Sequence, residues 1–179
     1  MFLSVFDMFK VGIGPSSSHT MGPMVAAKRF LQSLKNSPFN YSGVRVTLYG
    51  SLAFTGKGHA TDRAVILGLA NFSPDIYDPL ASEKAIQSIT EEKFIRSDDL
   101  GDLSFDPQKD LKFDYGPPLS GHPNGIIFTG LDDRGDTLFQ ETYYSIGGGF
   151  VLTSDELAAG KDKDEGSEVP FPFSSAEEM

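Results

Sequence analysis

The sequence predicts an α+β fold in which an antiparallel or mixed sheet packs with helices. Several short segments alternate apolar and polar residues as half-buried strands do, and three others repeat apolar residues at helical spacing. The two kinds of segment do not alternate as regular βαβ units, which argues against a doubly wound sheet. With 179 residues and 39% hydrophobic side chains, the chain can bury one substantial core.

The first predicted helix follows a loop rich in hydroxyl groups. Apolar residues in 24–34 recur at helical spacing, and Pro23 suits the first turn. The preceding Gly/Pro-bounded loop contains Ser16, Ser17, Ser18, His19 and Thr20. Unpaired N–H groups and the dipole at a helix N-terminus favour a carboxylate or phosphate, so this loop is a candidate anion-binding, proton-handling segment. Alternatively, Ser18 or Thr20 only caps the helix and the other serines are solvated.

One strand and two helices are predicted in the next part of the chain. Residues 42–50 alternate as a half-buried strand. Apolar spacing predicts a helix over 59–70, with Asp62 in its first turn, where a carboxylate suits the dipole. A further helix is predicted over 82–95 with Ser82 as its N-cap. We expect a loop dense in Asp and Gly to follow it.

The remaining strands are predicted around a rigid loop and a hairpin. Residues 111–115 and 125–131 have strand character and flank a Gly/Pro-rich loop that presents His122. A turn-rich segment then leads to a β-branched and aromatic strand over 137–145, which predicts a hairpin. The glycines at 147–149 allow a tight turn or a close approach to another surface.

The charge is uneven and excludes some partners. Of the net charge of -10, residues 152–179 contribute eight acidic side chains and two lysines, and we predict an acidic linker or tail there. No basic stripe remains to neutralise phosphates, so a nucleic-acid partner is not expected. No apolar run approaches the roughly 20 residues that span a bilayer, and no secretory signal precedes the first strand, so we expect no membrane partner and a cytoplasmic location.

The chain contains no cysteine, which limits its metal chemistry. It cannot form a disulfide, and it cannot supply thiolates to zinc or to an iron–sulfur cluster. Its three histidines, His19, His59 and His122, stand alone, without a second ligand at helical or strand spacing. We therefore predict no metal site in this chain.

Each of these histidines lies in an irregular segment bounded by Gly or Pro, where a rigid scaffold often displays functional side chains. His59 is expected at a helix start, where the positive end of the dipole disfavours the imidazolium ion. A neutral imidazole there would serve as a general base. The alternative for each histidine taken singly is a structural or surface role.

Four segments carry a resemblance to a known family. They are residues 4–23, 49–62, 121–125 and 143–150, in this order. Together they resemble the β (N-terminal) domain of the bacterial iron–sulfur-dependent L-serine dehydratases, also called L-serine ammonia-lyases or L-serine deaminases. The resemblance covers residues 1–151 and implies a fold similar to the allosteric substrate-binding domain of some phosphoglycerate dehydrogenases.

The resemblance implies a place for the chain within a larger lyase. The complete enzyme deaminates L-serine to pyruvate and ammonia with a 4Fe-4S cluster that an α domain ligates, and the cluster acts as a Lewis acid on the leaving hydroxyl. This chain has no cysteine, so the α domain would belong to the same longer chain or to a separate subunit, and residues 152–179 would lead toward it. The chain alone would be inactive, and a homodimer is expected.

The resemblance also implies roles for the residues of the site. It makes Ser16, Ser17, Ser18 and Thr20 ligands of the substrate carboxylate and ammonium, and His59 the preferred base. His19 lies in the same loop, and His122 would line the pocket or assist proton transfer. Asn124 would hold substrate or simply end a turn.

Two other readings of the same residues remain open. In the first, the chain is a regulatory module that binds serine or another small carboxylate without catalytic groups, and residues 147–149 line an effector pocket or a dimer interface. In the second, it is a small metallohydrolase whose three imidazoles converge on one metal ion. Stoichiometric binding of zinc or iron by the isolated chain would favour the second.

Overall fold

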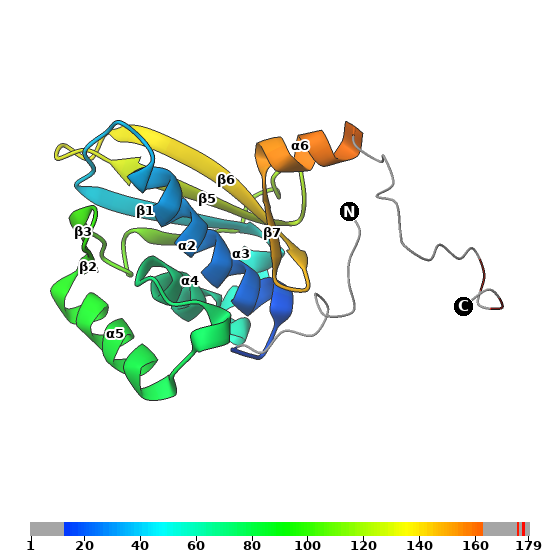
Figure 1. Ribbon diagram of the computed structural model, residues 1–179, viewed down its shortest axis with the longest axis horizontal. Helices are drawn as coiled ribbons and strands as arrows, with labels where there is room; N and C mark the ends of the chain where they lie inside the picture. The colour runs from blue at the N-terminus through cyan, green and yellow to red at the C-terminus, as the bar shows by residue number, and fades with distance from the viewer. Residues whose placement is uncertain (1–12, 163–174, 176, 178–179) are drawn as a thin grey trace.

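The computed structural model describes residues 13–162, 175 and 177, arranged as helices packed on an open mixed sheet (Figure 1). The elements in chain order are η1 (Ser17–Met21), α2 (Gly22–Lys35), β1 (Gly43–Gly50), α3 (Ser51–Thr55), η2 (Gly56–His59), α4 (Thr61–Leu69), η3 (Pro74–Ile76), α5 (Pro79–Glu92), β2 (Phe94–Ser97), β3 (Gly101–Ser104), β4 (Leu111–Asp114), β5 (Asn124–Leu131), β6 (Thr137–Gly147), β7 (Phe150–Thr153) and α6 (Ser154–Asp162). The predicted α+β class is confirmed.

The sheet is mixed because β1 has parallel neighbours on one side and an antiparallel neighbour on the other. The strand order is β2-β3-β1-β5-β6-β7, and β4 also pairs with β1. The pairs β1–β5, β5–β6 and β6–β7 are antiparallel, whereas β3 and β4 run parallel to β1. The predicted hairpin is confirmed as β5–β6, and the glycines at 147–149 form the β6–β7 turn with positive φ.

The predicted first helix is confirmed as α2, with Pro23 near its start and the predicted apolar positions buried. Phe30 is fully buried, and its ring stacks on Phe128 of β5 with centroids 5.1 Å apart. Strand β1 alternates as predicted: Val44, Val46 and Leu48 are buried, and the residues between them are half-buried. Figure 1 shows α2, α4 and α5 on the same side of the sheet, so the core lies between these helices and β1, β5 and β6.

The helix predicted with Ser82 as N-cap begins earlier. Asp78 caps α5 by accepting a hydrogen bond from the N–H of Ala81, and Pro79 occupies the first turn. Ser82 is buried inside the helix, and its hydroxyl has no hydrogen-bond partner among the described residues. The expected loop after this helix is also wrong, because a short hairpin of β2 and β3 occupies it. Asp78 and Ser82 are two capping candidates four positions apart, and the Pro after Asp78 decides between them.

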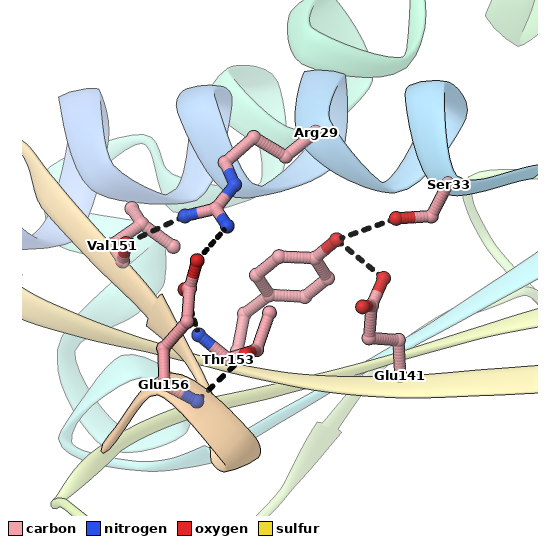
Figure 2. A network of polar contacts seen from close by, with 7 residues as sticks. Arg29, Ser33, Glu141, Val151, Thr153 and Glu156 are labelled. Carbon is pink, nitrogen blue, oxygen red and sulfur yellow. Dashed lines mark hydrogen bonds and ion pairs between the residues drawn. The ribbon is translucent and has the colours of Figure 1, made fainter. Parts of the chain in front are cut away.

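Regular structure continues past residue 152, where we predicted a linker or tail. Thr153 and Glu156 form a capping box: the N–H of Thr153 donates to Glu156 Oε2 (2.8 Å), and the N–H of Glu156 donates to Thr153 Oγ1 (3.1 Å). Figure 2 shows Arg29 of α2 bonded to the Val151 carbonyl (2.7 Å) and to Glu156 (2.8 Å). Helix α6 is therefore tied to α2. Of the rest of the predicted linker, residues 163–174, 176, 178 and 179 lie outside the described residues.

The same network holds α2 against β6. The Tyr143 hydroxyl donates to Glu141 Oε2 (2.5 Å) and lies 3.4 Å from Ser33 Oγ, and the Arg29 guanidinium stands 5.6 Å from the centre of the Tyr143 ring (Figure 2). Burial and the Glu141 carboxylate raise the pKa of the Tyr143 phenol, so this hydroxyl stays a donor.

Candidate functional site

Two of the three histidines that the sequence analysis singled out lie side by side. The rings of His19, in η1, and His59, at the end of η2, have centroids 4.9 Å apart and planes inclined by 42°. The two residues are 40 positions apart in sequence, so the contact depends on how η1 packs against η2. Both side chains are partly exposed, so solvent reaches the pair.

Two buried threonines hold the backbones of the histidines together. Thr20 Oγ1 donates to the His59 carbonyl (2.8 Å), and Thr61 Oγ1 donates to the His19 carbonyl (2.5 Å). Each side chain is 0% exposed. Pro23, four positions after His19, has no N–H and cannot complete an α-helical hydrogen bond to the His19 carbonyl. We call Thr20 and Thr61 the threonine clamp.

The predicted Ser-rich loop is a π-helical turn that runs directly into α2. Ser16 caps this turn by accepting the His19 N–H (3.1 Å), and the N–H of Ser16 donates to Thr20 Oγ1 (3.2 Å). The capping alternative with Ser18 or Thr20 is wrong, since the residue before α2 is Met21, which makes no side-chain capping bond. Ser16 and Thr20 therefore build the turn, while the hydroxyl of Ser17 has no partner among the described residues and its side chain is exposed.

Ser145 and Asn124 fix this turn to the sheet. Ser145 Oγ donates to the Ser18 carbonyl (2.7 Å), and Asn124 Nδ2 donates to the Ser145 carbonyl (3.0 Å). A Cβ on Gly22 would lie 2.0 Å from Ser145 Oγ, so only glycine permits this approach. The backbone N–H of Asn124 also donates to His122 Nδ1 (3.1 Å), a contact compatible with the predicted turn role.

The hydrogen bonds of the ring nitrogens differ among the three histidines. His19 has both nitrogens engaged, Nδ1 with Ser18 Oγ and Nε2 with Ser51 Oγ, each at 2.9 Å. His59 Nδ1 lies 2.9 Å from the Thr55 carbonyl oxygen, which can only accept, so Nδ1 carries the proton. In neutral His59 the lone pair is then on Nε2, which has no hydrogen-bond partner in the described part of the chain.

The environment of His19 favours its neutral form. Burial lowers the pKa of the His19 imidazole, the neighbouring His59 lowers it further, and the contact with Ser51 acts in the opposite direction. The sequence placed His59 in the first turn of a helix, but α4 begins at Thr61, and Ala60 before it has a left-handed φ of 53°. The Thr55 carbonyl, rather than a helix dipole, thus determines which nitrogen of His59 is free.

His122 lies on a neighbouring loop and does not join the pair. Within residues 13–162, no hydrogen bond or ring contact connects it to His19 or His59. Its loop is nevertheless joined to Ser51, whose hydroxyl contacts His19, because the N–H of Ser51 donates to the Pro123 carbonyl (3.0 Å). Since His122 Nδ1 accepts a hydrogen bond from the backbone N–H of Asn124, neutral His122 carries its own hydrogen on Nε2.

The described residues show neither a metal cluster nor a membrane span. No group of three His, Cys, Asp or Glu side chains within them is placed to hold a metal ion. No helix within them is long and apolar enough to cross a bilayer. The donors gathered at the site are hydroxyls, amides and imidazoles, which suit a small polar anion better than a cation.

Four residues of the site were not singled out from the sequence: Ser51, Thr55, Thr61 and Ser145. Three act through a hydroxyl and one through its backbone carbonyl, so composition and periodicity give no signal for them. All four do lie in the segments that carry the family resemblance.

The comparison with known proteins decides the family. The model of the family described as "Serine dehydratase beta chain" matches residues 4–156. The chain belongs to this family. The matched range of this serine dehydratase beta chain domain includes all the site residues described above.

Full-length relatives agree with this assignment. The chain is 40% identical over 176 residues to an L-serine dehydratase of Helicobacter pylori, covering 98% of this chain and 38% of that protein. It is 42% identical over 181 residues both to an L-serine dehydratase of Haemophilus influenzae and to L-serine dehydratase 2 of Escherichia coli, covering 99% of this chain and 39% of each. This serine dehydratase beta chain domain therefore spans about two-fifths of the length of the curated relatives it matches.

Proposed function

We propose that this chain is the β part of an L-serine dehydratase, in which His59 Nε2 is the base that removes the α-proton of L-serine. The proposal is supported by family membership, since the relatives are named L-serine dehydratases. The observation that carries it is the hydrogen bond from His59 Nδ1 to the Thr55 carbonyl, which leaves the lone pair of Nε2 free. We call the remaining portion of such an enzyme, which this chain does not contain, the α part.

The reaction needs a neutral imidazole with an unoccupied nitrogen. Nε2 takes the proton from Cα of serine, the C–H electron pair forms the Cα–Cβ double bond, and the β-hydroxyl leaves with its bonding electrons. The aminoacrylate product tautomerises to an imine, and water hydrolyses the imine to pyruvate and ammonia. His19 has both nitrogens engaged, and His122 carries a hydrogen on Nε2, so neither offers a free lone pair. A positioned general base contributes about 10²- to 10⁴-fold to the rate.

The start of the π-helical turn is the proposed carboxylate subsite. The backbone N–H groups of Ser17 and Ser18 point out of the first turn and have no acceptor among the described residues. With the hydroxyl of Ser17 they offer several donors to a carboxylate. Ser16 and Thr20 act here by shaping the turn that presents these donors. Because the pKa of His19 is lowered, this neighbouring ring adds no positive charge near the substrate ammonium at neutral pH.

The residues of this chain do not fit an iron–sulfur cluster. Such clusters are held mainly by cysteine thiolates, and the chain has no cysteine. The imidazoles of His19 and His59 are turned toward Ser18, Ser51 and Thr55 rather than toward a common centre. We therefore propose that any cluster of the complete enzyme, and the acid that assists departure of the hydroxyl, belong to the α part.

The test is turnover of L-serine by the chain assembled with its α part under anaerobic conditions. We expect His59→Ala to lower kcat for pyruvate release by about 10²-fold or more, with serine binding retained and with partial recovery in free imidazole. His122→Gln is the comparison and should cost much less. If His59→Ala keeps wild-type turnover, the base lies elsewhere, and a regulatory serine-binding module becomes the better interpretation.

A further inference from the structure

An aromatic surface includes α3, the helix that directly precedes the turn carrying His59. Phe54 of α3 and Tyr115, just after β4, are 62% and 57% exposed, and their rings contact each other at 5.4 Å between centroids, inclined by 62°. Lys57 Nζ stands 5.5 Å from the centre of the Phe113 ring. We call these four residues the Phe54 patch.

A groove continues the Phe54 patch toward the helices. It has a volume of about 560 Å³ and is lined in part by Lys57, Asp62, Ile66, Leu111, Phe113 and Tyr115. Other large exposed apolar side chains are scattered over the described surface, at positions 39, 76, 80, 94 and 146. Among the described residues, Phe54 and Tyr115 are the one aromatic pair in which both rings are exposed. Adjacent exposed aromatics beside a groove of mixed apolar and polar lining are typical of protein interfaces.

The patch and the proposed base share one short segment of chain. Phe54 lies between Ser51, which contacts His19 Nε2, and Thr55, whose carbonyl holds His59 Nδ1. Lys57 is two residues before His59, in the same turn. A protein surface that covers Phe54 and Lys57 is therefore brought close to the histidine pair.

We propose that the Phe54 patch and its groove bind the α part of the L-serine dehydratase, and that this contact closes the active site over His59. This rests on the proposed function. Two observations select the α part as the occupant. The relatives are about two and a half times as long as the matched segment. The group that assists departure of the hydroxyl, which this chain lacks, must also reach a serine held at the free nitrogen of His59. A second copy of this chain would bring no cysteine to the site.

Cysteine labelling tests the contact directly, because the chain has no cysteine of its own. Phe54→Cys, Tyr115→Cys and the control Leu80→Cys are each made in the complete enzyme, where this chain is joined to or produced with its α part. Leu80 on α5 is 76% exposed and lies outside the patch. The rate of N-ethylmaleimide addition is read from the peptide of this chain by mass spectrometry.

We expect the thiols at 54 and 115 to react about tenfold or more slowly than the thiol at 80, because the centre of an interface excludes solvent. Equal rates at all three positions would overturn the proposal. Protection that also appears in the chain without the α part, and that grows with its concentration, would assign the patch to a second copy and overturn it as well. Failure of the proposed base would look different: His59→Ala would keep its turnover while positions 54 and 115 stayed protected.

Discussion

Replacing Thr61 by valine removes one hydroxyl of the threonine clamp and keeps the shape of the side chain. Thr61 is 0% exposed, and its Oγ1 donates to the His19 carbonyl at 2.5 Å. Valine has the same branching at Cβ and suits the same helical position. The change therefore isolates the hydrogen bond from the packing.

The expected cost follows from the carbonyl that loses its donor. Pro23 cannot supply an N–H four positions after His19, so the partly buried His19 carbonyl loses this donor. Leaving a buried polar group unsatisfied costs about 1 to 3 kcal/mol. With a urea dependence of roughly 2 kcal/mol per molar, the unfolding midpoint should fall by about 1 M. The same loss should loosen the His19–His59 pair, since the bond from Thr61 to the His19 carbonyl joins the segments on which the two histidines lie.

The assay is urea unfolding followed by circular dichroism, with Thr90→Val as the matched control. Thr90 Oγ1 also donates to a backbone carbonyl, that of Ile86 at 2.7 Å, but on the exposed face of α5. The control should stay within about 0.5 kcal/mol of the wild type. If Thr61→Val is no less stable than Thr90→Val, the clamp does not hold the site together and the reasoning above fails.

Two further predictions concern the same turn. The pKa of His19 in the folded chain lies below the value of about 6.5 expected in the unfolded chain. Between these two pKa values the unfolded state binds more protons than the folded state. The free energy of unfolding therefore falls as pH drops below about 6.5. His19→Gln should flatten this part of the pH profile of urea midpoints, and an unchanged profile would contradict the assignment. Gly22→Ala should cost about 1 to 3 kcal/mol in urea unfolding, because the new Cβ meets Ser145 Oγ at 2.0 Å; wild-type stability would mean that the turn and β6 are not in contact.

The elements with a strong local signal were predictable from the sequence. Residues 24–34 and 42–50 have regular apolar spacing, and both became the expected helix and strand. The N-cap of the α5 helix was wrong because two local signals competed, and α6 was not predicted because the segment after Thr153 was read by composition alone. Asp78 and Ser82 both suit an N-cap, and the acidic composition after Thr153 concealed a capping box that begins α6.

The candidate site was predictable in part. The Ser16–Thr20 segment and His59 were identified from the sequence, and the structure brings His19 and His59 together. What local reasoning could not supply is the set of long-range contacts that joins them. Thr61 meets the His19 carbonyl only because α4 packs beside η1, and Ser145 reaches the Ser18 carbonyl from β6, 127 residues away in sequence. His122 makes no contact with the pair among the described residues, and its loop is joined to α3 by the hydrogen bond from the N–H of Ser51 to the Pro123 carbonyl.

The physical reason for proposing His59 as the base also changes: the Thr55 carbonyl replaces the helix dipole, and it suits a general base better. A positive helix end would favour the neutral ring before reaction but would oppose the imidazolium that proton abstraction creates. The Thr55 carbonyl accepts a hydrogen bond from Nδ1 in both forms, and its partial negative charge favours the cation as it forms. The carbonyl thus directs the lone pair of neutral His59 to Nε2 and then stabilises the charge that the ring acquires. An active site that must take a weakly acidic proton needs both of these effects at one residue.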